Sequence, residues 1–105
     1  MTEKQWQQQV VDLAQVYGWL VYHTYDSRRS EPGFPDLVMV HKGQERVIYA
    51  ELKTARGSLT PDQHEWLRAL QACGCEVYLW RPYDFGDVIE ILRPRLPTSA
   101  KGVSG

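Results

Sequence analysis

Two carboxylates and a lysine stand at a spacing that suits a metal-dependent hydrolytic site. Asp36 precedes Glu51-Leu52-Lys53 by fifteen residues, and both stretches are otherwise apolar and β-branched. If they are antiparallel strands joined by a turn at Gly43-Gln44, Asp36 faces Glu51 with Cβ atoms about 4.5–5.5 Å apart. Facing carboxylates repel each other, and a hard cation such as Mg²⁺ between them would relieve that repulsion.

Lys53 adds a cation to the same face, because side chains alternate along a strand and Glu51 and Lys53 are two residues apart. Its ammonium would lie near the place of an attacking water or a phosphate oxygen. The alternative is an ordinary Glu–Lys pair on a solvated strand end, since short motifs match by chance. Spacing alone leaves both interpretations open.

The elements that would position these residues follow from periodicity. Thr2 and Gln5 form a capping-box pattern before apolar residues at helical spacing, and Gly18 would end that helix. Runs of aromatic and β-branched residues predict strands at 19–24, 36–41, 46–53 and 77–80.

A second helix is expected to begin at Thr60-Pro61-Asp62-Gln63, with Thr60 as the cap, and to end at Gly74. Asp84 would cap a short last helix that ends at Leu92. The order α-β-β-β-α-β-α predicts an α/β fold with a mixed four-stranded sheet. Its first three strands form an antiparallel meander, and a right-handed crossover makes the fourth parallel to the third. Residues 1–96 are expected to form one domain, and residues 97–105 a flexible tail.

The composition is that of a small globular protein. The 105 residues include 12 Lys+Arg and 13 Asp+Glu, so a protein that binds nucleic acid by net charge alone is excluded. We expect a cytoplasmic location, because there is no apolar run of about 18 residues and no signal-peptide core. Cys73 and Cys75 lack the partners of a zinc site and are expected to be reduced thiols.

The four tryptophans are interpreted as core residues rather than as platforms for stacking bases. Trp6 and Trp66 lie on apolar helical faces, Trp80 ends an apolar strand, and Trp19 begins one. His23, near the end of the first strand, is expected to make a structural hydrogen bond.

Taken together, these motifs resemble the virus-type replication-repair nuclease (VRR-NUC) family of the PD-(D/E)XK nuclease superfamily. The resemblance spans roughly residues 2 to 92 and implies the restriction-endonuclease-like α-β-β-β-α-β core. The segments that carry it are, in chain order, Tyr17-Gly18-Trp19, His23, Arg28-Arg29-Ser30, Gly33-Phe34-Pro35-Asp36-Leu37, Glu51-Leu52-Lys53, Leu59-Thr60-Pro61-Asp62-Gln63, Trp66 and Trp80-Arg81-Pro82.

The resemblance implies a metal-dependent DNA endonuclease. Asp36 and Glu51 would hold Mg²⁺, with Mn²⁺ as a substitute and the backbone carbonyl of Leu52 as a further ligand. Lys53 would position or activate the attacking water. Glu3 matches an acidic residue that several such nucleases bring to the metal, and Gln63 matches a glutamine beside the lysine.

Simpler roles exist for the last two residues. Glu3 could interact only with the dipole of the first helix, and Gln63 could serve only in a capping box. For the DNA backbone we expect contacts from Arg28, Arg29, Ser30, Arg56 and Ser58, because guanidinium groups and hydroxyls bind phosphate oxygens. The alternative there is a solvated loop.

The substrate is expected to be DNA of a particular shape, since no base-reading recognition helix is evident. Small proteins that this chain resembles act as homodimers on branched DNA such as four-way (Holliday) junctions, where a two-fold pair meets two equivalent strands. Two alternatives remain from the sequence: a catalytically silent DNA-binding module, and an interaction domain whose acidic pair is structural.

Overall fold

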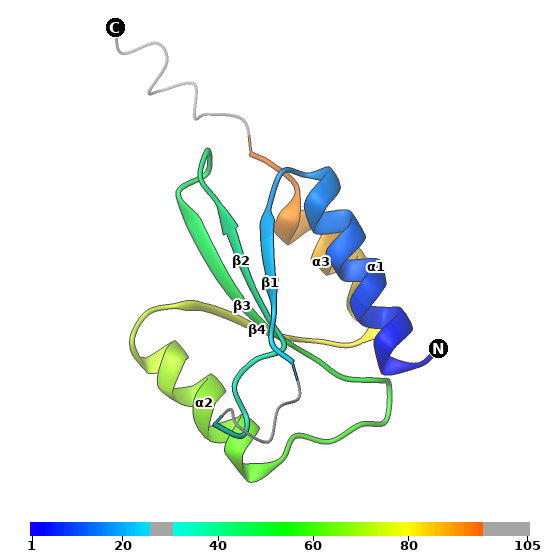
Figure 1. The fold of residues 1–105 in the computed structure, drawn as a ribbon, viewed down its shortest axis with the longest axis vertical. Coiled ribbons are helices and arrows are strands. Elements are labelled where there is room, and N and C mark those ends of the chain that lie inside the picture. Colours follow the sequence, from blue (N-terminus) through cyan, green and yellow to red (C-terminus); the bar gives the residue numbers. More distant parts are fainter. Residues whose placement is uncertain (26–30, 96–105) are drawn as a thin grey trace, which may run out of the picture.

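The computed structural model describes residues 1–25 and 31–95. The expected contacts from Arg28, Arg29 and Ser30 and the expected tail at 97–105 lie outside these residues. The elements are α1 (Glu3–Val16), β1 (Leu20–His23), β2 (Leu37–His41), β3 (Arg46–Leu52), α2 (Pro61–Ala72), β4 (Glu76–Trp80), a 3-10 turn η1 (Pro82–Asp84) and α3 (Phe85–Leu92) (Figure 1).

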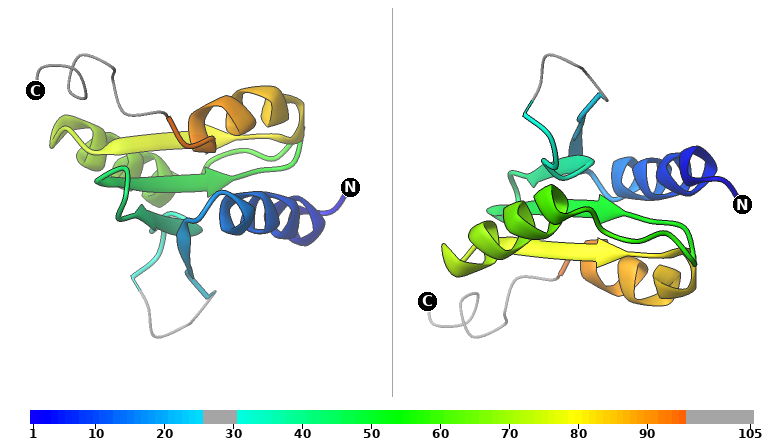
Figure 2. Two further views of the ribbon diagram at one scale, coloured as in Figure 1. Left: turned by 90° about the horizontal axis from the view of Figure 1, so that it is seen from above. Right: turned by 90° about the horizontal axis from the view of Figure 1, so that it is seen from below.

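The four strands form one mixed sheet in the order β1-β2-β3-β4. β1 pairs with β2 and β2 with β3 in antiparallel fashion, whereas β4 is parallel to β3. The helices α1 and α3 cover one face of this sheet, and α2 lies on the other side beside β4 (Figures 1 and 2). The expected fold class and sheet topology are therefore confirmed.

The β2–β3 hairpin has the predicted register but a longer turn. β2 ends at His41 and β3 begins at Arg46, so the connection has four residues rather than two. The pairs Leu37–Ala50 and His41–Arg46 are those that a two-residue turn would give. Lengthening the turn by one residue on each side preserves the register, and Glu45 takes the left-handed conformation (φ 52°) that closes it.

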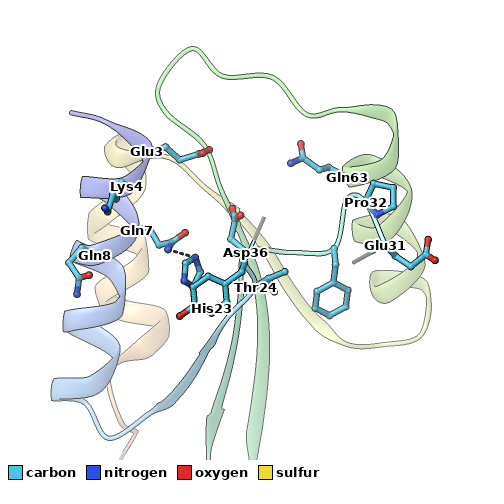
Figure 3. Close-up of a pocket in the computed structure, with 13 residues that line it drawn as sticks. Glu3, Lys4, Gln7, Gln8, His23, Thr24, Glu31, Pro32, Asp36 and Gln63 are labelled. Atoms are coloured by element: carbon cyan, nitrogen blue, oxygen red, sulfur yellow. Dashed lines mark hydrogen bonds between the residues drawn. The ribbon is translucent and has the colours of Figure 1, made fainter. Parts of the chain in front are cut away.

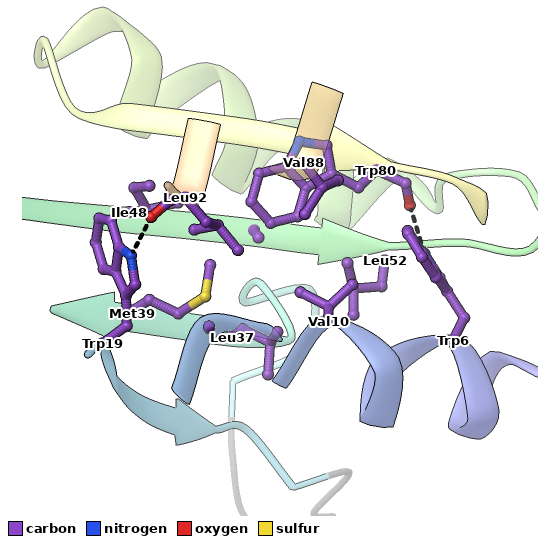
Figure 4. Close-up of a cluster of buried hydrophobic side chains, with 12 residues drawn as sticks. Trp6, Val10, Trp19, Leu37, Met39, Ile48, Leu52, Trp80, Val88 and Leu92 are labelled. Carbon is purple, nitrogen blue, oxygen red and sulfur yellow. Dashed lines mark hydrogen bonds between the residues drawn. The ribbon is translucent and has the colours of Figure 1, made fainter. Parts of the chain in front are cut away.

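The hydrophobic core lies between the sheet and the helices α1 and α3 (Figure 4). The indole nitrogen of Trp6 donates to the carbonyl of Trp80 at 3.1 Å, and that of Trp19 donates to the carbonyl of Leu92 at 2.8 Å. Both large side chains are thus buried with their polar atoms satisfied. Trp80 is buried as well, which confirms three of the four tryptophan predictions.

Trp66 differs from the other tryptophans, because it stays half-buried. All residues of α2 remain at least partly exposed, since this helix packs against the sheet from one side and no other described element covers it. Trp66 instead meets Phe34 edge-to-face, with ring centroids 5.1 Å apart.

Asp84 is the N-cap residue of α3, as expected, but its side chain makes no hydrogen bond to that helix. The Asp84 side chain instead accepts a hydrogen bond from the Arg81 amide at 2.8 Å, which closes η1. The reason is Pro82, which begins a 3-10 turn that runs straight into α3. Among the helices of the described residues, none is both long and apolar enough to span a lipid bilayer.

Candidate active site

A cleft of about 920 Å³ opens where β1 and β2 approach the first turns of α1 and α2. Asp36 lies at its centre, between residues of α1 on one side and of α2 on the other (Figure 3). The residues that matter for the chemistry and line the cleft are Glu3, Gln7, His23, Thr24, Asp36 and Gln63.

Asp36 is held by both neighbouring strands. Its carbonyl accepts a hydrogen bond from the Thr24 amide at 2.8 Å, which extends the β1–β2 ladder. Its carboxylate Oδ2 accepts one from the Leu52 amide at 2.8 Å, across to β3. Because Leu37 pairs with Ala50, the next pair outward places Asp36 opposite Glu51. The predicted convergence of the two carboxylates is therefore present.

Glu51 projects from the face of β3 opposite to the core, yet only 1% of it is exposed. Among the described residues its Oε1 has no hydrogen-bond partner, whereas Oε2 lies 3.8 Å from Nζ of Lys53. A buried carboxylate oxygen without a partner is costly, because it has lost its water. Among the described residues, this oxygen of Glu51 is therefore left available for a further partner.

The pKa values of both Asp36 and Glu51 are raised, so the ionised form of each is disfavoured in the protein. Burial raises the pKa of Glu51 to about 8, and the charge of Asp36 adds to the rise against the opposing effect of Lys53. Burial also raises the pKa of Asp36, although the Leu52 amide and Lys53 act against it. Without further positive charge, two anions at this place are unfavourable.

The donors fit a hard divalent cation such as Mg²⁺. Two carboxylates can approach one ion, and the unpaired Oε1 of Glu51 gains a ligand by doing so. Within residues 1–25 and 31–95, no three His, Cys, Asp or Glu side chains gather closely enough to hold an ion. The remaining ligands would therefore be the Leu52 carbonyl, water or substrate oxygens, which is usual for Mg²⁺.

Glu3 begins α1, and its carboxylate points toward the cleft between α1 and α2 (Figure 3). It lines the same cleft as Asp36 but does not complete a group of three acids with Asp36 and Glu51. Its expected role as a metal ligand stays a prediction.

Gln63 serves in the capping box of α2. Its side-chain Oε1 accepts a hydrogen bond from the Thr60 backbone amide at 2.9 Å, while the backbone amide of Gln63 donates to Oγ1 of Thr60 at 3.1 Å. It also lines the cleft, so the two interpretations are compatible. Because the cap uses Oε1, Nε2 is the atom left for a substrate.

The loop before Asp36 is fixed against α2. Gly33 has φ +93°, and a Cβ at this position would lie 2.5 Å from the backbone carbon of Asp62. Phe34 then packs edge-to-face on Tyr49 and Trp66. Glycine is required here for both reasons, and this contact sets Asp36 and Gln63 on facing walls of the cleft.

Of the expected DNA contacts, the structure describes Arg56 and Ser58. Both are exposed in the connection between β3 and α2, directly after Lys53.

Two contacts were missed from the sequence. Gln7 hydrogen-bonds the ring of His23 at 2.6 Å, in keeping with a structural histidine, and Arg81 binds the connection that carries Arg56.

The mixed four-stranded sheet thus brings the two carboxylates together beside Lys53, an arrangement compatible with a nuclease domain. The family model of the VRR-NUC domain matches residues 2–82. The chain therefore belongs to the VRR-NUC family, a family of nuclease domains.

Two solved structures of VRR_NUC domains have the same fold. A structure described as a VRR_NUC domain protein has a TM-score of 0.66 and 20% identity, covering 88% of this chain and 85% of that chain. A second VRR_NUC domain has a TM-score of 0.70 and 21% identity, covering 86% and 92%. Hjc from Archaeoglobus fulgidus, a Holliday junction resolvase, has a TM-score of 0.49 and 23% identity, covering 72% and 64%. No curated protein matches the chain in sequence.

Proposed function

We propose that this protein is a Mg²⁺-dependent endonuclease that hydrolyses phosphodiester bonds in branched DNA, with Mn²⁺ as a substitute metal. The observation that carries the proposal is the pairing of the half-buried Asp36 with the buried Glu51. One oxygen of Glu51 lacks a partner among the described residues, and Lys53 lies 3.8 Å from the other. Such a pair is unfavourable in a plain structural domain and favourable around a cation.

In this mechanism Asp36, Glu51 and the carbonyl of Leu52 hold Mg²⁺, which when bound supplies positive charge to the reacting phosphate. Lys53 orients the attacking water by hydrogen bonding and stabilises negative charge that develops on the phosphate oxygens. Water attacks phosphorus in line and gives up a proton to the solvent, the bond from phosphorus to the leaving 3′-oxygen breaks, and that oxygen takes up a proton from the solvent. The superfamily resemblance implies products with 5′-phosphate and 3′-hydroxyl ends.

The preference for branched DNA and the homodimer are part of the same proposal. A chain with one acid pair cuts one strand in each encounter, whereas a four-way junction presents two equivalent strands. A two-fold pair of protomers would present one cleft to each strand. The exposed Arg56 and Ser58, in the connection that follows Lys53, are suited to contacts with the DNA backbone, which depend on the path of the strand rather than on its sequence.

The test is cleavage of a labelled four-way junction, compared with a flap, a nick and a linear duplex of the same sequence. Mg²⁺ should support cutting, EDTA should abolish it, and Mn²⁺ should restore it. Analytical ultracentrifugation should show a dimer. Absence of cutting on every substrate would contradict the nuclease proposal, and junction binding without cutting would favour a silent DNA-binding module.

Lys53→Ala is expected to reduce the cleavage rate by about 100-fold or more while junction affinity measured in Ca²⁺ stays nearly unchanged. The matched control is Lys42→Ala, which removes an exposed lysine from the hairpin at the far end of β2 and β3. Lys42→Ala should cut like the wild type. Undiminished cutting by Lys53→Ala would contradict the role assigned to this lysine.

A further inference from the structure

Arg81 follows β4 and binds the connection that leaves the predicted catalytic strand. Its Nη1 donates to the carbonyl of Thr54 at 2.7 Å and to the carbonyl of Gly57 at 2.6 Å. Hydrogen bonds from a charged donor are among the stronger ones in proteins, and both bonds end on the same short turn. The turn at 54–57 is therefore attached to the end of β4.

This turn packs along the side chain of Lys53. The Gly57 amide donates to the Thr54 carbonyl at 3.2 Å, which closes the turn. A Cβ at Gly57 would lie 3.4 Å from Cδ of Lys53 and 3.2 Å from Oγ1 of Thr54. The backbone of Gly57 thus lies against the aliphatic part of Lys53, and movement of the turn would free that side chain.

The backbone around Arg81 is itself held by several hydrogen bonds. The Arg81 amide donates to Asp84 at 2.8 Å, and the preceding carbonyl, that of Trp80, accepts from both the Lys53 amide and the Trp6 indole. These bonds join the end of β3, the end of β4 and the first turns of α1. Through its two side-chain hydrogen bonds, Arg81 consequently fixes the turn 54–57 relative to the core.

We propose that Arg81 is a positioning residue for phosphodiester hydrolysis, which holds the turn 54–57 so that Lys53 is aligned with the reacting phosphate. The inference rests on the proposed nuclease function, because it concerns the alignment of Lys53 for that reaction. Arg81 itself is directed at two carbonyl groups rather than at the cleft. It acts through Lys53 and has no direct part in the chemistry.

The test is single-turnover cleavage of a four-way junction with protein and Mg²⁺ in excess, so that weaker DNA binding does not lower the measured rate. Arg81→Met keeps the length of the stem and removes both hydrogen bonds. The expected loss in rate is about 10- to 100-fold, as for other misaligned catalytic groups. Arg81→Lys should recover part of it, because an ammonium can donate to both carbonyls.

The matched control is Arg46→Met. Arg46 also donates to a carbonyl, that of Ile91 at 3.0 Å, and pairs with Glu76, but it lies at the start of β3, at the other end from Lys53. At a temperature well below both unfolding midpoints, Arg46→Met should cut within about twofold of the wild type. An equal loss in both variants would show a general stability effect and would overturn the proposal.

Amide hydrogen exchange supplies a readout independent of activity. In Arg81→Met the Gly57 amide should exchange faster than in the wild type and in Arg46→Met. A wild-type cleavage rate in Arg81→Met would overturn the positioning role and leave the nuclease proposal intact. A wild-type protein that cuts no DNA would overturn both.

A second variant covers the case in which Arg81→Met does not fold. Gly57→Ala keeps Arg81 and perturbs the turn beside Lys53, since the added Cβ would lie a tight 3.2 Å from Oγ1 of Thr54 and in contact with Cδ of Lys53 at 3.4 Å. It should cut several-fold more slowly with little change in unfolding midpoint. Wild-type cutting by Gly57→Ala would overturn the proposal as well.

Discussion

The Glu51 carboxyl is buried, and its pKa of about 8 compares with 4.5 for an unperturbed glutamate. Burial is the main cause, and the neighbouring charge of Asp36 is the next. A carboxyl whose pKa is higher in the folded state favours folding while it is protonated. That stabilisation is complete below about pH 4.5 and is lost as the pH rises through about 8.

The metal-free protein should therefore lose stability between pH 5 and pH 9 relative to Glu51→Gln, which cannot ionise at this position. The free energy of unfolding of each protein is measured by urea titration at several pH values in EDTA. The difference between wild type and variant should fall by at most about 1.4 kcal/mol per pH unit, the limit for one proton. A pH-independent difference would show that Glu51 is ionised throughout.

Mg²⁺ should reverse that loss, since a cation between Asp36 and Glu51 favours the ionised forms that burial disfavours. Millimolar Mg²⁺ is expected to raise the unfolding midpoint of the wild type more at pH 8.5 than at pH 6. Glu51→Gln should respond weakly at both pH values, because it offers one carboxylate fewer. An equal response from both proteins would place the ion elsewhere.

At the scale of elements, the acid pair depends on how the loop before β2 docks on α2. Gly33 approaches the backbone of Asp62 so closely that a Cβ would lie 2.5 Å from its carbonyl carbon, and its φ of +93° is unfavourable for other residues. Phe34 then reaches Tyr49 and Trp66. A shift of this loop would move Asp36 away from Glu51.

Gly33→Ala should lower the free energy of unfolding by more than the penalty of placing alanine in a left-handed conformation, because its Cβ would also clash with Asp62. Gly74 makes the comparison possible, because its φ is +82° and a Cβ there would meet no described atom within 4 Å. Gly74→Ala is expected to cost about 1–2 kcal/mol, the usual penalty of a left-handed conformation. Gly33→Ala should exceed it and also slow DNA cleavage; urea unfolding and the junction assay measure these two effects.

If the two alanine variants were equally destabilised and equally active, the loop would not depend on close contact with α2. In that case the positions of Asp36 and Gln63 on facing walls would need another explanation.

The elements also show which parts of the site a sequence can predict. The turn assumed at Gly43-Gln44 set the predicted register, and Asp36 does meet Glu51 because the longer turn of the structure adds one residue on each side. The burial of Glu51 did not follow, because Glu51 lies on the face of β3 away from the core, where alternation predicts exposure. The bonds from Arg81 were also beyond prediction, since they join residues far apart in the chain through an irregular turn.

At the scale of the whole molecule, the packed domain extends further along the chain than the residues that match the family model. The match ends at residue 82, whereas α3 follows at Phe85–Leu92. Val88 and Leu92 are fully buried in the core, and the Leu92 carbonyl accepts the hydrogen bond from Trp19. Arg46 of β3 donates to the neighbouring carbonyl of Ile91. The helix α3 therefore completes the core that positions the site.

Leu92→Ala should consequently destabilise the protein by about 2–5 kcal/mol, as expected for a large aliphatic side chain removed from a packed core. The control in the same helix is Glu90→Ala, which breaks only an exposed pair with Arg93 and should cost less than about 1 kcal/mol. Urea unfolding followed by tryptophan fluorescence measures both, because Trp6 and Trp19 lie in the same core. A small cost for Leu92→Ala would mean that the sheet and α1 form a stable core without α3, and that the folding unit ends where the family match does.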